Sequence, residues 1–572
     1  MSSVPTGQQG RSSRPGGPGR SGAAGQSAAT PADGAQAGGA RATSPGGRPP
    51  VAVRYAPVIL AAAVMAVLGV WGLARDSSMG NDEVATRWAA LLSLHQLGRL
   101  LRHVDAVHGL YYLVMHGWMA AGTSPAVMRI PSVIAMVVAV ALTVIVGRRL
   151  TGSGWAGLFA GLIVALTPAI SYYSQTARSY ALVFACAAGS TLALLHALAA
   201  EAPGAAPGTG DASAGGAADE AGGTRFPAGR WLVYAVLLVA GGYLNELSLL
   251  VVAAHAVTVL LARYGRRALV HWAATAAVSV ILVLPLAALS AREDAAVAWI
   301  PRPGLWSLRI LFHDYFGATT AAAVLLFCCA VAAVLPPLQR GRSAPGPAWW
   351  SHGGVSLPSV AAPLLVIPGV LLILESLVAR PLYVDRYVLY GEAGAALLAG
   401  AGALRIGRWL AGAPAGRRTL VWVPGVVVCV LALVLQLAPQ HRVRTPQSRL
   451  FDFGGPSRYL AAHARQDDGV LFFSSFFRKA RLGYPADYRS VSDFAMAESP
   501  AAAGNFQGRD KPVAAVQSLM AGYQRIWVVG RSPSAHLTAG PVRAEDAALR
   551  SHFSLSAKRH FKGIFVTLWV RR

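Results

Sequence analysis

Charged residues are scarce in this sequence, and acidic residues are scarcer than basic ones. Asp, Glu, Lys and Arg make up 13% of the chain, whereas 54% of its residues are hydrophobic. Soluble proteins carry about 25% charged residues, so this composition indicates a membrane protein. The formal net charge of +25 does not indicate a nucleic-acid partner, because the arginines punctuate apolar runs and form no basic stripe interleaved with aromatic residues.

Cysteine is also rare, and its placement excludes two kinds of structure. All four cysteines lie inside apolar runs, as small buried hydrophobic residues do; they are Cys186, Cys328, Cys329 and Cys429. None lies in the polar C-terminal part, and no Cys/His cluster has the spacing of a zinc site. The sequence therefore predicts neither a disulfide framework nor a zinc centre.

Large apolar residues are nearly absent from residues 1–50, which consist mainly of Gly, Ser, Ala, Pro and Arg. Such a segment cannot bury enough surface to offset the entropy of ordering, so a disordered tail is predicted. It is too long and too polar for a cleaved signal peptide. The apolar run Val51–Leu73 is then a signal-anchor, and the arginines before it predict a cytoplasmic N-terminus with Asp82 on the outer side.

Residues 51–438 contain about eleven apolar segments that approach the roughly 20 residues of a membrane span. These segments are Pro57–Leu73, Ile130–Val146, Trp155–Ile170, Tyr180–Leu198, Trp231–Tyr243, Leu249–Leu261, Leu269–Leu289, Ala318–Leu335, Val360–Val378, Val388–Leu404 and Leu420–Leu437. The Ala/Gly-rich tract 201–229 is predicted to be a disordered cytoplasmic linker, and residues 292–317 an outer loop.

The short apolar and aromatic segment His108–Ala121 leaves two topologies open. If it lies at the outer surface as an interfacial helix, every Arg cluster in a short loop is cytoplasmic. If it spans the membrane, all these clusters lie outside. The tendency of basic loops to stay in the cytoplasm favours the first topology.

Residues 440–572 have a different composition and predict a small extracytoplasmic α/β domain, within the usual size range of domains. Residues 469–475, 525–530 and 564–570 have the pattern of buried strands bounded by turns, and residues 514–523 that of a helix. The segment contains no phosphate-loop motif, and its sequence indicates no chemistry.

Polar residues gather in three loops on the predicted outer side. Polar groups at a membrane surface cost free energy, so their presence there indicates a function. The first contains Asp82-Glu83 and then Asp105–Tyr112, the second is Tyr172–Tyr180, and the third is Arg380–Tyr387. Together they supply carboxylates, a histidine, guanidinium groups and aromatic rings. Glycosyl transfer from a lipid phosphate needs such a set, because a carboxylate takes the proton of the acceptor hydroxyl and guanidinium groups stabilise charge on the phosphate leaving group.

The order and spacing of these motifs resemble those of a known superfamily. The matching elements are Asp82-Glu83 after the first span, Asp105-x-x-His108-x-x-Tyr111-Tyr112, Arg129-Ile-Pro-Ser132 opening a span, Gly147-Arg-Arg ending it, Tyr173-Ser-Gln-x-x-Arg178-x-Tyr180 and Asp385-Arg386-Tyr387. Over roughly residues 57–437 the chain resembles the GT-C membrane glycosyltransferases, in their protein O-mannosyltransferase and aminoarabinose transferase (RgtA/B/C/D-like) branch. Gly109 departs from the proline that this superfamily often has after the histidine.

The resemblance implies a role for each candidate residue. Asp82 would be the catalytic base with Glu83 beside it, and Arg178 and Arg386 would bind the donor phosphate. The implied substrate-binding residues are His108, Tyr112, Tyr173, Tyr180 and Tyr387. The implied reaction is an inverting direct displacement at the plasma membrane, from a polyprenyl-phosphate sugar (a hexose such as mannose, or a pentose) to a hydroxyl of a lipid, protein or wall polymer.

The residues themselves also allow other roles for the candidate side chains and other functions for the protein. Asp82-Glu83 could be a solvated pair, Arg386 could pair with Asp385, and Arg178 could anchor a span end. The histidine could be a packing residue, and the tyrosines could form an interfacial aromatic belt. A divalent metal on the adjacent carboxylates is possible, although two such groups are not a site. The rival functions are a lipid or solute transporter or flippase, with ionisable groups near the bilayer midplane, and a membrane scaffold displaying the C-terminal domain.

Overall fold

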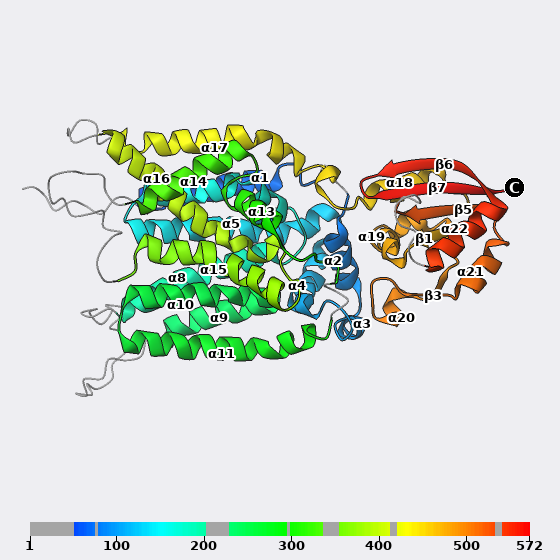
Figure 1. The fold of residues 1–572 in the computed structure, drawn as a ribbon, viewed down its shortest axis with the longest axis horizontal. Coiled ribbons are helices and arrows are strands. Elements are labelled where there is room, and N and C mark those ends of the chain that lie inside the picture. The colour runs from blue at the N-terminus through cyan, green and yellow to red at the C-terminus, as the bar shows by residue number, and fades with distance from the viewer. Residues whose placement is uncertain are drawn as a thin grey trace, which may run out of the picture. The chain divides into compact units, whose positions relative to one another are not determined.

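The computed structural model describes residues 51–74, 78–201, 228–293, 298–335, 354–411, 420–531 and 540–572. The predicted tail, residues 1–50, and almost all of the predicted linker 201–229 lie outside these ranges. Along the described chain, long helices extend to Arg442, and a mixed region of helices and strands follows (Figure 1).

Most helices of the first part are apolar, and many are long enough to cross a bilayer. Within the described ranges, six single helices qualify, two further bent pairs qualify if each is one span, and three shorter apolar helices accompany them. Their bounds are α1 (Val51–Val70), α5 (Pro125–Thr151), α6 (Gly154–Leu166), α7 (Pro168–Ser174), α8 (Tyr180–Ala200), α9 (Ala228–Leu244), α10 (Leu250–Ala262), α11 (Arg266–Ser290), α13 (Leu305–Phe316), α14 (Thr320–Val334), α15 (Leu357–Val378), α16 (Glu392–Ala411, preceded by the 3-10 turn η5, Asp385–Gly391) and α17 (Val423–Arg442). The bent pairs are α6 with α7 at 68° and α13 with α14 at 74°.

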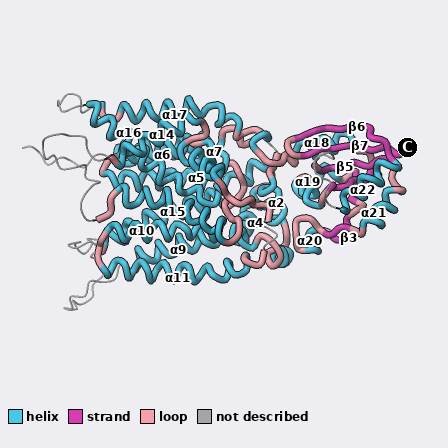
Figure 2. The backbone as a smooth tube through the Cα atoms, in the orientation of Figure 1, coloured by secondary structure: helices cyan, strands magenta, loops and turns pink. Residues whose placement is uncertain are grey.

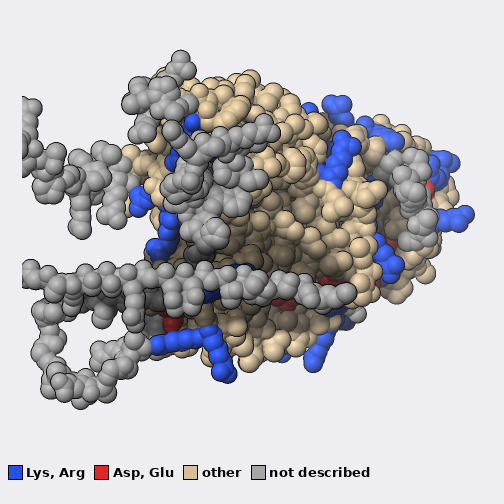
Figure 3. Space-filling model, turned by 60° about the vertical axis from the view of Figure 1, so that its left-hand side comes forward, with Lys and Arg blue, Asp and Glu red and all other residues tan. Residues whose placement is uncertain are grey.

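The outer surface of these helices is apolar and their interior is closely packed. On α11, Ile281, Leu282 and Leu284 are each more than half exposed. Inside the bundle, small residues let helices approach: a Cβ added at Gly402 of α16 would lie 1.7 Å from the carbonyl oxygen of Cys329 in α14. On the face shown in Figure 3, the zone between the two ends of the helices is mostly free of charged side chains. The chain is therefore a multi-pass α-helical membrane protein.

Each of the eleven apolar segments expected from the sequence corresponds to one of these helices or bent pairs, although the number that crosses a membrane stays a prediction. The expectation of a loop over residues 292–317 was wrong, because part of that segment is α13. Gly304 and Gly317 delimit a run rich in Leu, Trp and Phe. This run is too short for a span but long enough for a helix.

Residues 108–121 form short helices. Helix α4 has ten residues, which rise about 15 Å, or about half the hydrocarbon thickness of a bilayer. This length favours the topology in which the segment does not span. The elements of this region are α2 (Asn81–Leu91), α3 (Leu94–Leu100), η1 (Ala106–His108), α4 (Gly109–Trp118) and η2 (Met119–Ala121).

The polar loops and the basic pair Arg148-Arg149 lie at opposite ends of helix α5. Helix α5 begins beside the polar loops, where Arg129 forms an ion pair with Glu83, and its last turn contains Arg148 and Arg149. Arg149 donates a hydrogen bond to the carbonyl of Leu195, near the end of α8. We call the end with the polar loops the pocket end and the other the basic end.

The region after Arg442 contains an α/β domain, and Figure 2 shows the strands gathered there. Its elements are α18 (Gly454–His463), β1 (Asp468–Phe473), α19 (Lys479–Gly483), β2 (Val491–Asp493), β3 (Met496–Glu498), α20 (Pro500–Ala503), β4 (Arg509–Asp510), α21 (Val513–Met520), β5 (Arg525–Gly530), α22 (Gly540–His552), β6 (Phe553–Phe561) and β7 (Ile564–Arg571). The main sheet has the order β2-β1-β5-β7-β6. Strands β2, β1 and β5 are parallel, and β7 and β6 are antiparallel. The three predicted strands are β1, β5 and β7, and the predicted helix is α21.

Candidate active site

A cavity of about 940 Å³ lies at the pocket end, between the helices and the α/β domain. The three polar loops identified from the sequence all contribute to its walls. The predicted site residues that line it are Asp82, Glu83, His108, Tyr173, Arg178, Tyr180, Arg386 and Tyr387. Loops separated by up to about 300 positions in the chain thus converge on one space, as the resemblance implied.

Asp82 lies in the first turn of α2, where free N–H groups and the helix dipole favour a negative charge. Its carboxylate accepts hydrogen bonds from the Tyr180 hydroxyl at 3.3 Å and from the Asn81 amide at 3.2 Å. Burial alone would raise the pKa of Asp82, but the positive charges of Arg386 and Arg178 outweigh it and lower the pKa. Asp82 is therefore an ionised group that faces the cavity, and within the described residues it has no ion pair at contact distance.

Both carboxylate oxygens of Glu83 are engaged in hydrogen bonds and ion pairs within the protein. Arg129 donates to both of its oxygens, at 2.7 and 3.0 Å, and Arg449 forms a second ion pair with it. The backbone N–H groups of Gly80 and Ala177 donate to it at 3.1 and 3.2 Å. Burial would raise the pKa of Glu83, but the two guanidinium groups lower it to about 2. These contacts favour a positioning role for Glu83, and its predicted catalytic role stays a prediction.

Arg178 is held by a buried carboxylate and a tyrosine. It donates to Asp105 at 3.1 Å and to the Tyr112 hydroxyl at 2.7 Å, and that hydroxyl donates to Asp105 at 2.5 Å. Burial would raise the pKa of Asp105, but Arg178 holds it well below its usual range. Tyr112 is fully buried and does not line the cavity. It therefore fixes Arg178 from behind, and a direct contact of Tyr112 with substrate is not favoured.

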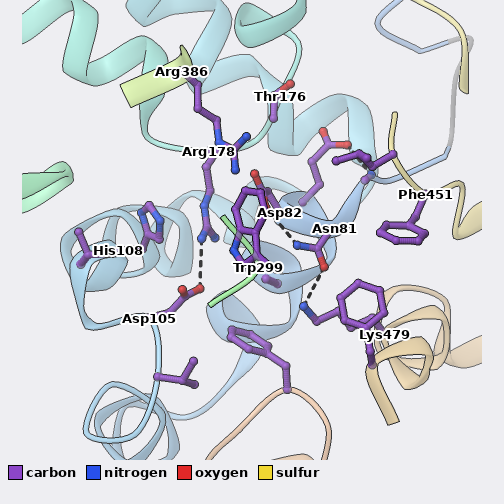
Figure 4. A pocket seen from close by; sticks show the side chains of 18 of the residues that line it. Asn81, Asp82, Asp105, His108, Thr176, Arg178, Trp299, Arg386, Phe451 and Lys479 are labelled. Carbon is purple, nitrogen blue, oxygen red and sulfur yellow. Dashed lines mark hydrogen bonds and ion pairs between the residues drawn. The ribbon is translucent and has the colours of Figure 1, made fainter. Parts of the chain in front are cut away.

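Arg386 is surrounded by aromatic rings. Its Nε donates to the Tyr180 hydroxyl at 2.9 Å, and its guanidinium lies 5.5–5.6 Å from the ring centres of Tyr180, Trp299 and Tyr387. Within the described residues, its two terminal nitrogens have no hydrogen-bond acceptor. Figure 4 shows Arg386, Arg178 and Asp82 around a common space. The free face of this guanidinium can receive an anion with the two-pronged geometry of phosphate oxygens.

The remaining tyrosines form a packed row beside Arg386. Tyr173 and Tyr180 meet edge to face with ring centres 5.4 Å apart, and Tyr387 follows at 6.3 Å from Tyr180. The Tyr173 hydroxyl donates to Asp385 at 3.2 Å. No ion pair joins Asp385 to Arg386 within the described residues, so the structural pairing considered from the sequence is not supported.

His108 lines the cavity but is almost fully buried, at 4% exposure. Its Nδ1 lies 3.5 Å from the Ser179 hydroxyl oxygen. Burial, together with the positive charge of Arg178, lowers the pKa of His108 to about 3. The ring is therefore neutral at physiological pH, and it shapes the wall of the cavity without adding charge.

Residues of the α/β domain also line the cavity, and no pattern in the sequence predicts this. Lys479 opens α19 and is 7% exposed. Phe476 and Phe506 line the same wall, and Trp299 enters from the segment before α13. None of these residues belongs to a motif or to a periodic pattern. Only the contact between two distant parts of the chain places them at the site.

The residues present do not fit a divalent metal held by the adjacent carboxylates. Both oxygens of Glu83 are engaged by Arg129 and Arg449, and a cation there would face two positive charges. In the part of the chain that the structure describes, no group of three or more His, Cys, Asp or Glu side chains is arranged to hold a metal.

Comparison with known proteins gives a match in structure but none in sequence. No protein-family model matches the chain, and no curated protein matches it. The crystal structure of ArnT from Cupriavidus metallidurans bound to undecaprenyl phosphate has a TM-score of 0.52 and 12% identity, over 90% of this chain and 98% of that one, and its apo state gives the same values. The apo oligosaccharyltransferase of Archaeoglobus fulgidus has a TM-score of 0.41 and 10% identity, over 84% and 70% of the two chains.

The chain thus shares the fold of the ArnT structure, in line with the resemblance of its motifs to the GT-C membrane glycosyltransferases. The match to ArnT extends over nearly the whole of both chains, so it includes the C-terminal domain as well as the helices. A shared fold does not by itself define a reaction. The activity depends on the side chains around the cavity.

Proposed function

We propose that this protein is a membrane glycosyltransferase that moves a sugar from a polyprenyl-phosphate donor to a hydroxyl acceptor. The observation that carries the proposal is the Asp82 carboxylate, which is ionised, faces the cavity and has no ion pair within the described residues. The fold agrees with it, since the matching ArnT structure holds undecaprenyl phosphate. The sugar is a hexose such as mannose or a pentose, and the acceptor is a lipid, a protein or a wall polymer.

The proposed reaction is a single displacement with inversion at the anomeric carbon. Asp82 takes the proton of the acceptor hydroxyl while its oxygen attacks that carbon. The new oxygen–carbon bond forms as the bond between the carbon and the phosphate oxygen breaks. The polyprenyl phosphate leaves with the electron pair of that bond, and Asp82 holds the proton. Because its pKa is lowered, Asp82 is in the required carboxylate form before the acceptor binds.

The two arginines have different parts in this scheme. Arg386 has free terminal nitrogens, within the described residues, and binds the phosphate directly. Arg178 is tied to Asp105 and Tyr112, so its position is fixed and it contributes mainly positive charge. Such preorganised charge stabilises the phosphate most as negative charge develops on it. The aromatic rings beside Arg386 suit the sugar face or the first isoprene units.

The proposed location is the outer face of the plasma membrane, with the N-terminus in the cytoplasm. The arginine clusters at the basic end support this orientation, because basic loops remain in the cytoplasm. The cavity then opens at the outer leaflet, where a polyprenyl chain can keep the donor in the bilayer. A transporter or flippase is less favoured, because its ionisable groups would lie near the middle of the spans. In the cavity, Asp82 lies in the first turn of α2 and Arg178 lies just before the first residue of α8.

The test is sugar transfer by the purified full-length protein with a radiolabelled polyprenyl-phosphate sugar, scored as release of lipid phosphate. Asp82→Asn should lose at least about 100-fold in rate, since general-base catalysis contributes about that much or more. Asp467→Asn is the matched control, because Asp467 is exposed, lies far along the chain in the α/β domain and has a positive φ that Asn also adopts. Normal transfer by Asp82→Asn, with the wild type active, would remove Asp82 from this role.

A further inference from the structure

The α/β domain holds the segment that carries Asp82. The Ser78 hydroxyl donates to Asp452 at 2.5 Å, and the Met79 backbone N–H donates to the Tyr484 hydroxyl at 2.6 Å. These contacts join positions that are 374 and 405 residues apart in the chain. The start of α2 is therefore fixed by residues beyond the last membrane helix.

A third contact from the α/β domain leads to the carboxylate itself. The Lys479 ammonium donates to the side-chain oxygen of Asn81 at 2.7 Å, and the Asn81 amide nitrogen donates to Asp82 at 3.2 Å. Figure 4 shows this chain of contacts beside the cavity. Lys479 is held between aromatic rings, with its nitrogen 4.8 Å from the ring centre of Phe476 and 5.3 Å from that of Phe506.

The direction of these hydrogen bonds has a chemical consequence. A lysine ammonium can only donate, so it must face the oxygen of the Asn81 amide. The amide nitrogen is then turned toward Asp82 and donates to it. Without the ammonium, the Asn81 amide loses the partner of its oxygen, and the single hydrogen bond to Asp82 alone would hold its orientation.

We infer that Lys479 is a positioning residue for Asp82 and acts through the orientation of the Asn81 side chain. This inference rests on the proposed function, and it makes the α/β domain a part of the active site rather than an appended module. Loss of Lys479 should therefore lower kcat. It should leave the KM for the donor unchanged, because Arg386 and not Lys479 is assigned to the phosphate.

Titration of Lys479 supplies a second readout. Burial lowers the pKa of Lys479 to about 8, against the raising effects of Asp105 and Asp82, while Arg178 lowers it further. A neutral amine can accept a hydrogen bond as well as donate one, so above that pH Lys479 no longer requires the oxygen of the Asn81 side-chain amide to face it. Transfer should thus decline as the pH rises through about 8. Lys479→Arg stays protonated in this range and should lose this decline.

The experiment measures kcat, the donor KM and the pH profile of the full-length protein for Lys479→Met, Asn81→Ala and the double variant. Each single variant should lower kcat by about tenfold, the size expected of a small misplacement of a reacting group. The double variant should lose no more than the worse single variant, because both changes break one pathway. Lys511→Met is the control, since Lys511 is a half-buried lysine of the same domain that bonds the Phe494 carbonyl and does not line the cavity.

Each outcome separates the inference from the proposed function. If the wild type transfers sugar but Lys479→Met does so equally well, the inference is wrong and the proposed function stands. Losses that multiply in the double variant, or an unchanged alkaline decline in Lys479→Arg, would also overturn it. A wild type that transfers no sugar from any polyprenyl-phosphate donor would overturn the proposed function and the inference with it.

Discussion

The buried ion pairs of Glu83 allow a quantitative test of its structural role. Glu83→Gln keeps the size and shape of the side chain but removes its charge. The guanidinium groups of Arg129 and Arg449, both at most 8% exposed, would then lose the carboxylate charge with which each forms an ion pair. Removing one partner of such a buried pair costs about 3–5 kcal/mol. We therefore expect a large loss of stability from this substitution.

The pKa of Glu83 leads to a similar magnitude. It falls from 4.5 to about 2 in the folded protein, and at about 1.4 kcal/mol per pH unit this corresponds to about 3 kcal/mol of stabilisation. Because the folded-state pKa is the lower one, this contribution is fully present above pH 4.5 and is lost as the pH falls toward 2. The stability advantage of the wild type over Glu83→Gln should therefore shrink between pH 5 and pH 3.

The assay is denaturant unfolding in mixed micelles at both pH values. Glu498→Gln is the matched control, since its ion pair with Arg509 is exposed and should contribute at most about 1 kcal/mol. A Glu83→Gln protein as stable as the wild type at neutral pH would refute the structural assignment. A stability difference that does not depend on pH would show that packing, and not charge, is responsible.

Two further predictions concern the cavity wall. Arg386→Lys should raise the donor KM by about tenfold with little change in stability, because lysine keeps the charge but not the forked guanidinium that matches phosphate oxygens. Titration of the donor in the transfer assay measures this KM. An unchanged KM would argue against a contact between Arg386 and the phosphate. Since His108 is neutral above pH 3 or so, the wild-type rate profile should show no step between pH 6 and 7; a step there that His108→Gln abolishes would show that this histidine titrates during turnover.

The helical part of the fold could be predicted because its signal is local. An apolar run of span length must form a helix in a bilayer, where every backbone polar group needs a partner within its own segment. Strands β1, β5 and β7 were recognisable for a related reason, since each is buried along most of its length. Strand β6 was missed because most of its side chains are exposed, and an exposed edge strand has no apolar pattern to recognise.

The site could be predicted only in part. The motifs indicated that Asp82, Arg178 and Arg386 belong together, and all of them line one cavity. The sequence did not show that Tyr112 lies behind the wall, since a tyrosine in a polar loop has the same local pattern in either place. It also gave no sign of Lys479, because that residue reaches the cavity through the docking of a domain about 400 positions away from Asn81.

The adjacent carboxylates of Asp82 and Glu83 have different surroundings, which only the three-dimensional structure distinguishes. Successive helix positions differ by about 100° in direction, so Asp82 and Glu83 must point to different sides of α2. The side of Glu83 meets Arg129 and Arg449, and its charge is neutralised in the interior. The side of Asp82 meets the cavity, where cations stabilise its charge without contacting it directly. The ion pairs of Glu83 with Arg129 and Arg449 fix the start of α2. The carboxylate of Asp82 is therefore held in a fixed position while it forms no ion pair of its own within the described residues.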